Sequence, residues 1–485
     1  MAECGKPDVA AEGVDVIDAN KRRLDARLVV SIVACGVMSF AGVVAETAMN
    51  VAFPVLMSEF GVDTASVQWI TTGYLLVLTV IMPLSSYLKK RFRMRTLFIT
   101  AEILFICGTV LCMLAPVFPA LILGRVIQGI GTGLALPLMF NIVIEQAPLD
   151  KMGLMMGVAT LITATAPAVG PSVGGLIVTT MGWRMIFAIL LPFLVASFVA
   201  GILTIRQVGD TKKTAFGFGQ FVALGCAFAS LVFATSSAST AGWLSAEVLG
   251  LIAVSIVLLA VFVVLSRRSA APLIRVDIFK SRSYTLTVLF VVLFQAIVLG
   301  LGYLLPYYGQ VVGGLNEFEG GCLLLPGCIV GAILAPFGGR ILDVLGARGP
   351  ITAGSIIQLV GIALFAFIGL AVDPVFLALI YVLIPVSQGL AMSNSITNGL
   401  RYLPEDLRTD GNATNNTLQQ LGGALGTAIA TSVVNGAQAS SSDLVVGTLV
   451  GTGMAFEVLL GMAAVAFVLV LCVFAGRGSQ KGARN

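Results

Sequence analysis

The feature that most constrains this chain is a succession of apolar segments, each about as long as a membrane is thick. The first begins near residue 29, the last ends near residue 474, and only short polar stretches separate them. A bilayer core about 30 Å thick requires roughly 20 apolar residues per helix. Hydrophobic residues make up 58% of the chain and charged residues 11%, which excludes a soluble globular protein. Because backbone groups in lipid must be satisfied within the segment, we predict an all-α integral membrane protein.

We count fourteen such segments, each with ends uncertain by a few residues. They cover residues 29–57, 68–88, 96–115, 119–145, 154–180, 185–205, 216–236, 247–266, 285–309, 319–342, 351–370, 375–400, 414–434 and 448–474.

Positive charge is distributed unequally between the loops on the two sides. Of the 28 Lys and Arg residues, all except Arg125 and Arg184 fall in the terminal segments or in loops on one side. Cytoplasmic loops of membrane proteins retain the positive charge. Both termini are therefore predicted to be cytoplasmic, which requires an even number of spans.

The chain contains an internal duplication. Pro83, Leu88 and Arg95 recur at an offset of 253 residues as Pro336, Ile341 and Arg348. Parallel halves with a site between them are typical of transporters. The expected units are a cytoplasmic tail (1–28), a six-helix bundle (29–205), an inserted helix pair with flanking loops (206–284), a second six-helix bundle (285–474) and a cytoplasmic tail (475–485).

Several kinds of chemistry are excluded by what the sequence lacks. It has no histidine, no C-x-x-C pair and no Gly-Lys-Ser/Thr phosphate loop, and its basic residues form no aromatic-interleaved cluster. We therefore expect no metal, no cofactor, no nucleic-acid partner and no enzymatic activity. Proton chemistry near neutral pH must use carboxylates.

One apolar segment carries helix breakers on a single face. Pro167, Gly170, Pro171 and Gly174 are spaced i, i+3, i+4 and i+7, and Gly175 follows. In a membrane such a face allows a kink and a close approach to another helix. A tight packing seam and a hinge are both compatible with this pattern.

Four stretches together carry a family resemblance. They are Glu46-Thr47-Ala48-Met49-Asn50-Val51-Ala52-Phe53-Pro54, Gln68-Trp69-Ile70-Thr71-Thr72-Gly73-Tyr74, Leu123-Gly124-Arg125-Val126-Ile127-Gln128-Gly129 and the segment 166–175. Over residues 29–474 the chain resembles the fourteen-span drug:proton antiporters of the major facilitator superfamily, closest to their lincomycin-resistance-like branch. The resemblance implies two six-helix bundles plus two extra central helices, and it makes residues 166–175 an antiporter motif that we interpret as a hinge and seal against proton leak.

Glu46 is the predicted proton carrier. It lies near the middle of the first segment, where an ionised carboxylate costs roughly 2.5–3.5 kcal/mol, so it should face a cavity or bind a proton. The alternative is a carboxylate tied permanently to a hydroxyl such as that of Thr47. Asn50 lies one turn further on and could contact cargo. The family more often has its acid at the place of Ala45, while the lincomycin-resistance-like branch resembles this chain in using Glu46.

Arg125 is the only base predicted to be buried within a span, and an arginine at such depth needs a partner or a role. The resemblance implies coupling to proton transfer, with Gln128 close enough to share the network or to contact cargo. The alternative is an arginine that snorkels to the membrane edge. Glu102, about 10 Å into the third segment at 1.5 Å per residue, is a weaker candidate for proton coupling.

The loop after the second span normally carries Gly, Asp, Arg and Gly in this superfamily and forms a cytoplasmic latch. Here Ser86, Lys90 and Arg93 replace conserved features of that pattern, whereas the second copy retains Gly339, Asp343, Gly346 and Arg348. We expect the main latch at Asp343, Gly346 and Arg348. Lys90, Arg91 and Arg95 would then serve topology or lipid contact.

Polar side chains in the second half could line the cargo path. The candidates are Gln295, Tyr303, Asn394 and Asn398, although helix-packing hydrogen bonds would explain each equally well. The overall prediction is a proton-coupled exporter of amphipathic drug-like compounds, a monomer in the bacterial cytoplasmic membrane in contact with lipid. Export of an endogenous metabolite or lipid, nutrient symport and a non-transporting sensor are the alternatives.

Overall fold

The computed structural model describes residues 25–62, 64–67, 69–148, 151–207, 216–269, 272–368 and 373–475. Within these ranges every regular element is a helix, so the all-α prediction is confirmed. The terminal tails predicted at 1–28 and 475–485 lie almost entirely outside the described residues.

The first part of the chain forms nine helices. They are α1 (Ala26–Val51), α2 (Phe53–Phe60), α3 (Thr64–Val67), α4 (Trp69–Ile81), α5 (Leu84–Arg91), α6 (Met94–Leu114), α7 (Phe118–Gln146), α8 (Met152–Met181) and α9 (Arg184–Thr204). Some of the short ones are separated from the next helix by only one or two residues.

The middle and last parts follow the same pattern. They comprise α10 (Phe218–Ala241), α11 (Ala246–Arg268), η3 (Val276–Lys280), α12 (Arg282–Val311), α13 (Glu317–Cys322), α14 (Leu325–Leu345), α15 (Arg348–Phe367), α16 (Pro374–Tyr381), α17 (Leu383–Ser387), η5 (Gln388–Met392), α18 (Ser393–Arg401), η6 (Glu405–Leu407), α19 (Arg408–Ala439) and α20 (Leu444–Ala475). The element η5 is a π-helix, a wide turn that is frequent at functional sites.

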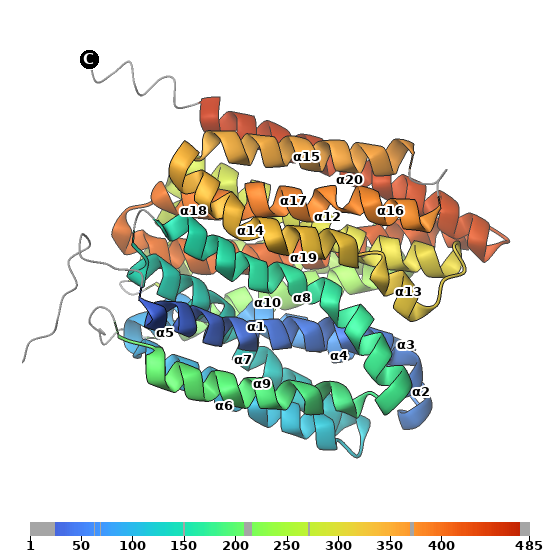
Figure 1. The fold of residues 1–485 in the computed structure, drawn as a ribbon, viewed down its shortest axis with the longest axis horizontal. Helices are drawn as coiled ribbons and strands as arrows, with labels where there is room; N and C mark the ends of the chain where they lie inside the picture. The colour runs from blue at the N-terminus through green and yellow to red at the C-terminus, as the bar shows by residue number, and fades with distance from the viewer. Residues whose placement is uncertain are drawn as a thin grey trace, which may run out of the picture.

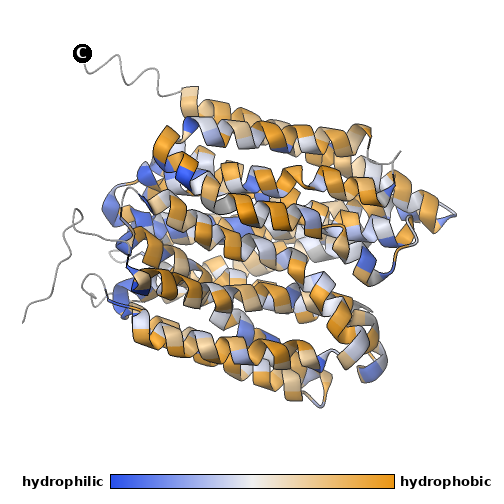
Figure 2. Cartoon of the chain, viewed as in Figure 1, coloured by the Kyte–Doolittle hydropathy of each residue, from blue (hydrophilic) through white to orange (hydrophobic). Residues whose placement is uncertain are grey.

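Ten helices in the described residues are long and apolar enough to cross a membrane, or eleven if the bent α8 is included. Figure 2 shows that their surfaces are mostly apolar and that hydrophilic residues gather at the two ends of the bundle. Helix α4 has only 13 residues because the chain leaves the helix at Met82 and Pro83 before α5 begins.

The helices run roughly parallel in two groups. In Figure 1, α1 and α6 to α9 lie on one side, and α12 and α14 to α20 lie on the other. The two groups meet where α8 contacts α14 and where α7 contacts α19. Helices α10 and α11 pack on each other, and α10 contacts both α4 and α19. The pair therefore lies against both groups, in a position compatible with an insertion between duplicated halves.

Helix α8 is bent by 41° between Met152–Pro167 and Val169–Met181. The bend coincides with the first proline of the breaker face, because proline removes a backbone donor and clashes with the preceding turn. The helix-breaking pattern therefore produces a kink within a continuous element.

Candidate functional site

The buried arginine of α7 lies at the centre of a polar network among α4, α6 and α7. Arg125 is 0% exposed, its Nε donates to the Ile70 carbonyl at 3.2 Å and its Nη1 donates to Gln128 Oε1 at 2.8 Å. Gln128 Nε2 in turn donates to Thr109 Oγ1 at 2.8 Å. These contacts exclude the alternative of an arginine that snorkels to the membrane edge.

The same guanidinium lies over an aromatic ring. Its central carbon is 4.1 Å from the centroid of the Tyr74 ring, and the Tyr74 hydroxyl donates to Thr132 Oγ1 at 3.0 Å. Arg125 Nη2 is buried and has no hydrogen-bond partner among the residues that the structure describes. An unsatisfied buried charged donor is costly, so it marks a position where a further acceptor can bind.

Glu46 of α1 lies within electrostatic reach of this network. Its carboxylate is close enough to interact electrostatically with the guanidinium of Arg125 and with the hydroxyl of Tyr74. The side chain is half-buried, and no hydrogen bond to it is found among the described residues. Thr47 Oγ1 donates to the Val43 carbonyl at 2.9 Å, so the proposed tie between this hydroxyl and Glu46 is not formed. The side chain of Asn50, the predicted cargo contact one turn on, lies outside what the structure describes.

The breaker face of α8 packs directly beside Glu46. A Cβ atom added at Gly170 would collide with Thr47 Oγ1, and one added at Gly174 would lie 2.7 Å from the Ala48 Cα. The nearest atoms to a Cβ at Gly175 are at ordinary contact distance, 3.6 Å. Glycine is thus required at the two positions where α8 meets the helical turn that carries Glu46.

Glu102 occupies a different place from the network. It is fully buried among α6, α9 and α1, where Ser197 Oγ donates to its Oε1 at 3.3 Å and to the Ala34 carbonyl at 2.9 Å. Its Oε2 has no hydrogen-bond partner within the described part of the chain. The structure therefore brings Glu46, Arg125 and Gln128 together and leaves Glu102 outside the group.

One end of the bundle, which we call the basic end, holds the loops with Lys89 to Arg95 and Arg401 to Arg408. Here Lys90 Nζ binds both oxygens of Asp410 at 2.8 and 3.0 Å, which joins α5 to α19. The Asp410 side chain is 0% exposed. Lys89 forms an ion pair with Glu145 and donates to Thr409 Oγ1 at 2.9 Å.

A second junction at the basic end joins α14 to α8. Asp343 accepts hydrogen bonds from the backbone N–H groups of Gly153 and Leu154, both at 3.2 Å, and lies 3.7 Å from Arg401. A Cβ at Gly153 would lie 2.6 Å from the Gly339 carbonyl oxygen, so the two backbones are in direct contact. Carboxylates favour helix N-termini because of the free N–H groups there.

The remaining predicted latch residues make weaker contributions. Gly346 ends α14 with a φ of 78°, a conformation that favours glycine, and the exposed Arg348 begins α15. Arg91 and Arg95 have no ion pair in the described part of the chain.

Sequence reasoning missed several residues of the basic end. Asn412 Nδ2 donates to Asn141 Oδ1 at 2.9 Å and approaches the Pro137 carbonyl at 3.4 Å, which joins α19 to α7. Asn416 Nδ2 donates back to Asn412. The signal was present in the polar run from residue 409 to 417, which is unusual at the start of an apolar segment.

The predicted cargo residues of the second half all have contacts within the protein, two of them with other helices and two within their own segment. Asn394 Nδ2 donates to the carbonyls of Gly338 and Leu390, while its Oδ1 has no hydrogen-bond partner in the ranges that the structure describes. Gln419 Nε2 donates a long hydrogen bond of 3.4 Å to Gln295 Oε1. Asn398 Nδ2 lies 3.5 Å from the Tyr402 hydroxyl oxygen. Tyr303 stacks on Tyr307 with centroids 5.4 Å apart.

The opposite end of the bundle is held by a cluster around Glu59 of α2. Trp183 Nε1 and Arg184 Nη1 donate to its two oxygens, each at 2.7 Å, and Arg184 Nη2 donates to the Ala115 carbonyl. The hydrogen bond from Trp183, followed by the contact with Arg184, lowers the pKa of the Glu59 carboxyl below its ordinary value of 4.5. Arg184, the one base predicted on this side, is therefore structural.

Comparison with known proteins agrees with this architecture. A family model described as Major Facilitator Superfamily matches residues 35–427. The chain belongs to the major facilitator superfamily. It is accordingly a multi-pass protein of the bacterial cell membrane, from a family of transporters.

Three known members illustrate the relationship. The Lincomycin resistance protein LmrB of Listeria monocytogenes is 36% identical over 399 residues, or 82% of this chain and 85% of the relative. LmrB of Bacillus subtilis is 35% identical over 401 residues, or 82% and 84%. The crystal structure of the human organic anion transporter MFSD10 superposes with a TM-score of 0.64 at 15% identity, covering 92% of this chain and 100% of that one, which shows a shared fold.

Proposed function

We propose that this transporter exports amphipathic drug-like compounds in exchange for protons. The observation that carries the proposal is the electrostatic interaction between Glu46, a half-buried carboxylate, and Arg125, whose buried Nη2 has no hydrogen-bond partner among the described residues. The names of the LmrB relatives support lincomycin-type or other drug-like cargo.

The proposed arrangement in the membrane has fourteen spans and both termini in the cytoplasm. Bundles 29–205 and 285–474 rock about a mid-membrane site, with the pair within 206–284 alongside them. Three elements add to the eleven spans that length and apolarity show: α3 to α5 together, α14 extended by α13, and α19. The basic end is then cytoplasmic.

Glu46 and Arg125 act as one coupled unit in this scheme. A proton on Glu46 removes its attraction to Arg125, and its release restores a carboxylate that Arg125 Nη2 can bind. Gln128 and Tyr74 hold the guanidinium in place and therefore position it. Because Gly170 and Gly174 of α8 contact the residues next to Glu46, a change in the α8 bend would move the carboxylate.

The two junctions of the basic end form the proposed cytoplasmic latch. Lys90 with Asp410 and Asp343 with Gly153 both join the first bundle to the second, so both must break before the cytoplasmic side opens. The driving force is sufficient: one proton crossing 100 mV is worth about 2.3 kcal/mol, which sustains a roughly fifty-fold gradient of neutral cargo.

The test is transport in everted membrane vesicles with an imposed pH gradient. Wild type should accumulate lincomycin with stoichiometric proton movement, and Glu46→Gln should lose the response to the pH gradient. Glu457→Gln, at an exposed carboxylate of α20, is the matched control and should couple normally. Accumulation without proton movement in wild type, or normal coupling in Glu46→Gln, would contradict the proposal.

A further inference from the structure

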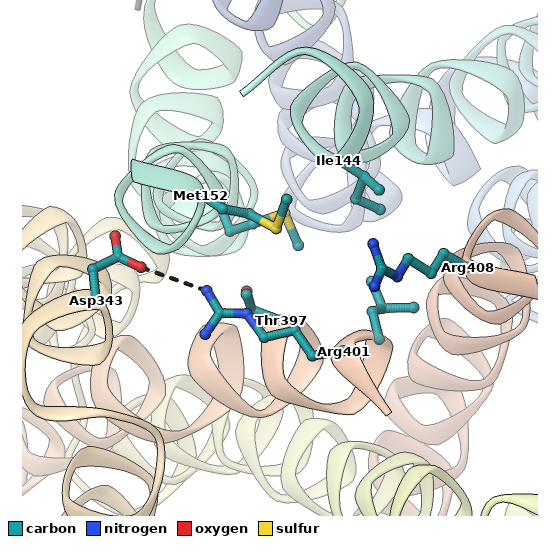
Figure 3. Close-up of a pocket in the computed structure, with 8 residues that line it drawn as sticks. Ile144, Met152, Asp343, Thr397, Arg401 and Arg408 are labelled. Atoms are coloured by element: carbon teal, nitrogen blue, oxygen red, sulfur yellow. Dashed lines mark ion pairs between the residues drawn. The ribbon is translucent and has the colours of Figure 1, made fainter. Parts of the chain in front are cut away.

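A cavity of about 300 Å³ at the basic end adjoins the latch junction at Asp343, but the mechanism proposed above assigns it no ligand. It lies where α7 and α8 of the first bundle face α14, α18 and α19 of the second. Figure 3 labels six of the residues around it: Ile144, Met152, Asp343, Thr397, Arg401 and Arg408. Its volume is at the lower limit of small-molecule sites, which suits a single compact group.

The charge of the cavity is positive. Two arginines face one acid, and Asp343 already accepts the backbone N–H groups of Gly153 and Leu154. Arg401 Nη2 is 3.7 Å from Asp343 Oδ1, beyond a good hydrogen bond, so its donors are not saturated by that contact. The charge of Asp343 is thus shared with a helix terminus, and it does not neutralise both arginines.

Arg408 supplies the unmatched charge. Its Nε donates to the Leu403 carbonyl at 3.4 Å, and no ion pair of Arg408 is found among the described residues. Figure 3 shows its guanidinium turned toward the cavity near Ile144, while Arg401 reaches across from the neighbouring helix. An acceptor placed in the cavity would therefore meet guanidinium groups on two of its sides.

Apart from Thr397, the rest of the lining is apolar, and the cavity lies at the level of helix ends. Met152 is the first residue of α8 and Arg401 the last of α18, while Ile144 is near the end of α7. This is the depth of lipid headgroups, with apolar side chains adjoining a basic cluster. Guanidinium groups match phosphate geometry, and basic pockets between membrane helices on the cytoplasmic side bind anionic headgroups.

We propose that this cavity binds the phosphate headgroup of an anionic phospholipid. Arg401 and Arg408 contact the phosphate, and Ile144 with Met152 contacts the adjoining glycerol and methylene groups. Because the lining comes from both bundles, the bound headgroup stabilises the arrangement in which the basic end is closed. Binding itself is independent of the proposed export function, and only its effect on the transport cycle rests on it.

The test measures lipid-dependent stability of the purified chain in nanodiscs. Phosphatidylglycerol titrated into phosphatidylcholine nanodiscs should raise the midpoint of thermal unfolding, followed by tryptophan fluorescence. Arg408→Gln should weaken the apparent affinity for phosphatidylglycerol about fivefold, the factor expected for one basic residue near a membrane surface. Arg268→Gln, the same change at an exposed position ending α11, should match wild type.

Two further variants keep the test decisive. Arg408→Lys loses the hydrogen bond to Leu403 but keeps the charge, so it should retain most of the affinity. Arg401→Gln should weaken binding about as much as Arg408→Gln. If Arg408→Gln does not fold, Arg401→Gln takes its place in the test.

Two results would overturn the proposal. Equal weakening by Arg268→Gln and Arg408→Gln would show general surface attraction instead of a site. Inorganic phosphate that stabilises the chain equally in pure phosphatidylcholine nanodiscs would identify a soluble anion as the occupant. Neither readout involves cargo, so failure here is separate from failure of export.

Discussion

At the scale of single residues, the buried network explains why an arginine is present within the membrane. Arg125 combines a cation–π contact with Tyr74 and hydrogen bonds to Ile70 and Gln128, and its Nη2 has no hydrogen-bond partner among the described residues. Lysine could supply the charge but not the planar fork that makes these contacts simultaneously.

Arg125→Lys should therefore impair coupling although it preserves the charge. We expect proton-driven accumulation in everted vesicles to fall at least tenfold, roughly the loss of 1.4 kcal/mol of one charged hydrogen bond. Gln128→Leu should have an intermediate effect, because it removes the group that orients Nη1 but leaves the guanidinium. Wild-type coupling in Arg125→Lys would show that charge alone suffices.

The Glu59 cluster predicts a pH dependence of stability at the opposite end. The pKa of this carboxyl is lowered in the folded protein, so its contribution is present above the unfolded pKa and is lost as pH falls through the folded pKa. Because the pair is substantially exposed, Glu59→Gln should lower stability only slightly at pH 7, by about 0.2–1 kcal/mol.

Thermal unfolding in detergent measures this contribution. The difference in midpoint between wild type and Glu59→Gln should be present at pH 7 and should shrink toward zero below pH 4.5. An unchanged difference at low pH would indicate that Trp183 and Arg184 do not depend on the charge of Glu59.

At the scale of elements, the close contact between α8 and α1 determines which glycines of α8 have no space for a side chain. Gly170 and Gly174 face Thr47 and Ala48 with no space for a side-chain carbon, whereas Gly175 has ordinary space. The five residues that sequence reasoning grouped as one motif are therefore not equivalent.

Gly170→Ala and Gly174→Ala should reduce coupled export strongly, because each added methyl group must displace α1 at the turn that carries Glu46. Gly175→Ala should retain most of the activity. The measurement is proton-coupled accumulation at matched membrane insertion. If all three variants behave alike, helix packing in general and not this contact is responsible.

At the scale of the whole molecule, the duplication relates the two latch junctions to each other. The equivalent position carries a positive charge in the first copy and a negative charge in the second. Lys90 and Asp343 occupy the same position at the offset of 253, and each reaches the first turn of the helix from the other bundle. In the second copy the acid binds backbone N–H groups of α8. In the first copy the position is basic, and α19 supplies Asp410 in its first turn.

Lys90→Asp should therefore place two carboxylates together and open the basic end, since an unpaired buried charge costs about 3–5 kcal/mol. The double variant Lys90→Asp/Asp410→Lys should restore closure. Spin labels at the exposed positions Thr96 and Gly349, in a cysteine-free background, report the separation of the two bundles at this end. Failure of the double variant to restore the wild-type distance would mean that the pair does not act as a latch.

What the sequence determined by itself follows from rules that act locally or along one helix. Segment length and apolarity predict membrane helices, and the spacing of Pro167, Gly170 and Gly174 predicts a kinked, closely packed face. Depth in a span singles out Glu46 and Arg125. These inferences need only the properties of the bilayer and the period of a helix.

The tertiary structure decided which of these residues meet. Only the packing of α4 and α6 against α7 brings Tyr74 to Arg125 and Thr109 to Gln128, and leaves Glu102 apart in another interface. Likewise the pairing of Lys90 with Asp410 joins residues separated by 320 positions. Such contacts depend on the relative placement of helices far apart in the chain, and no local period of the sequence encodes that placement.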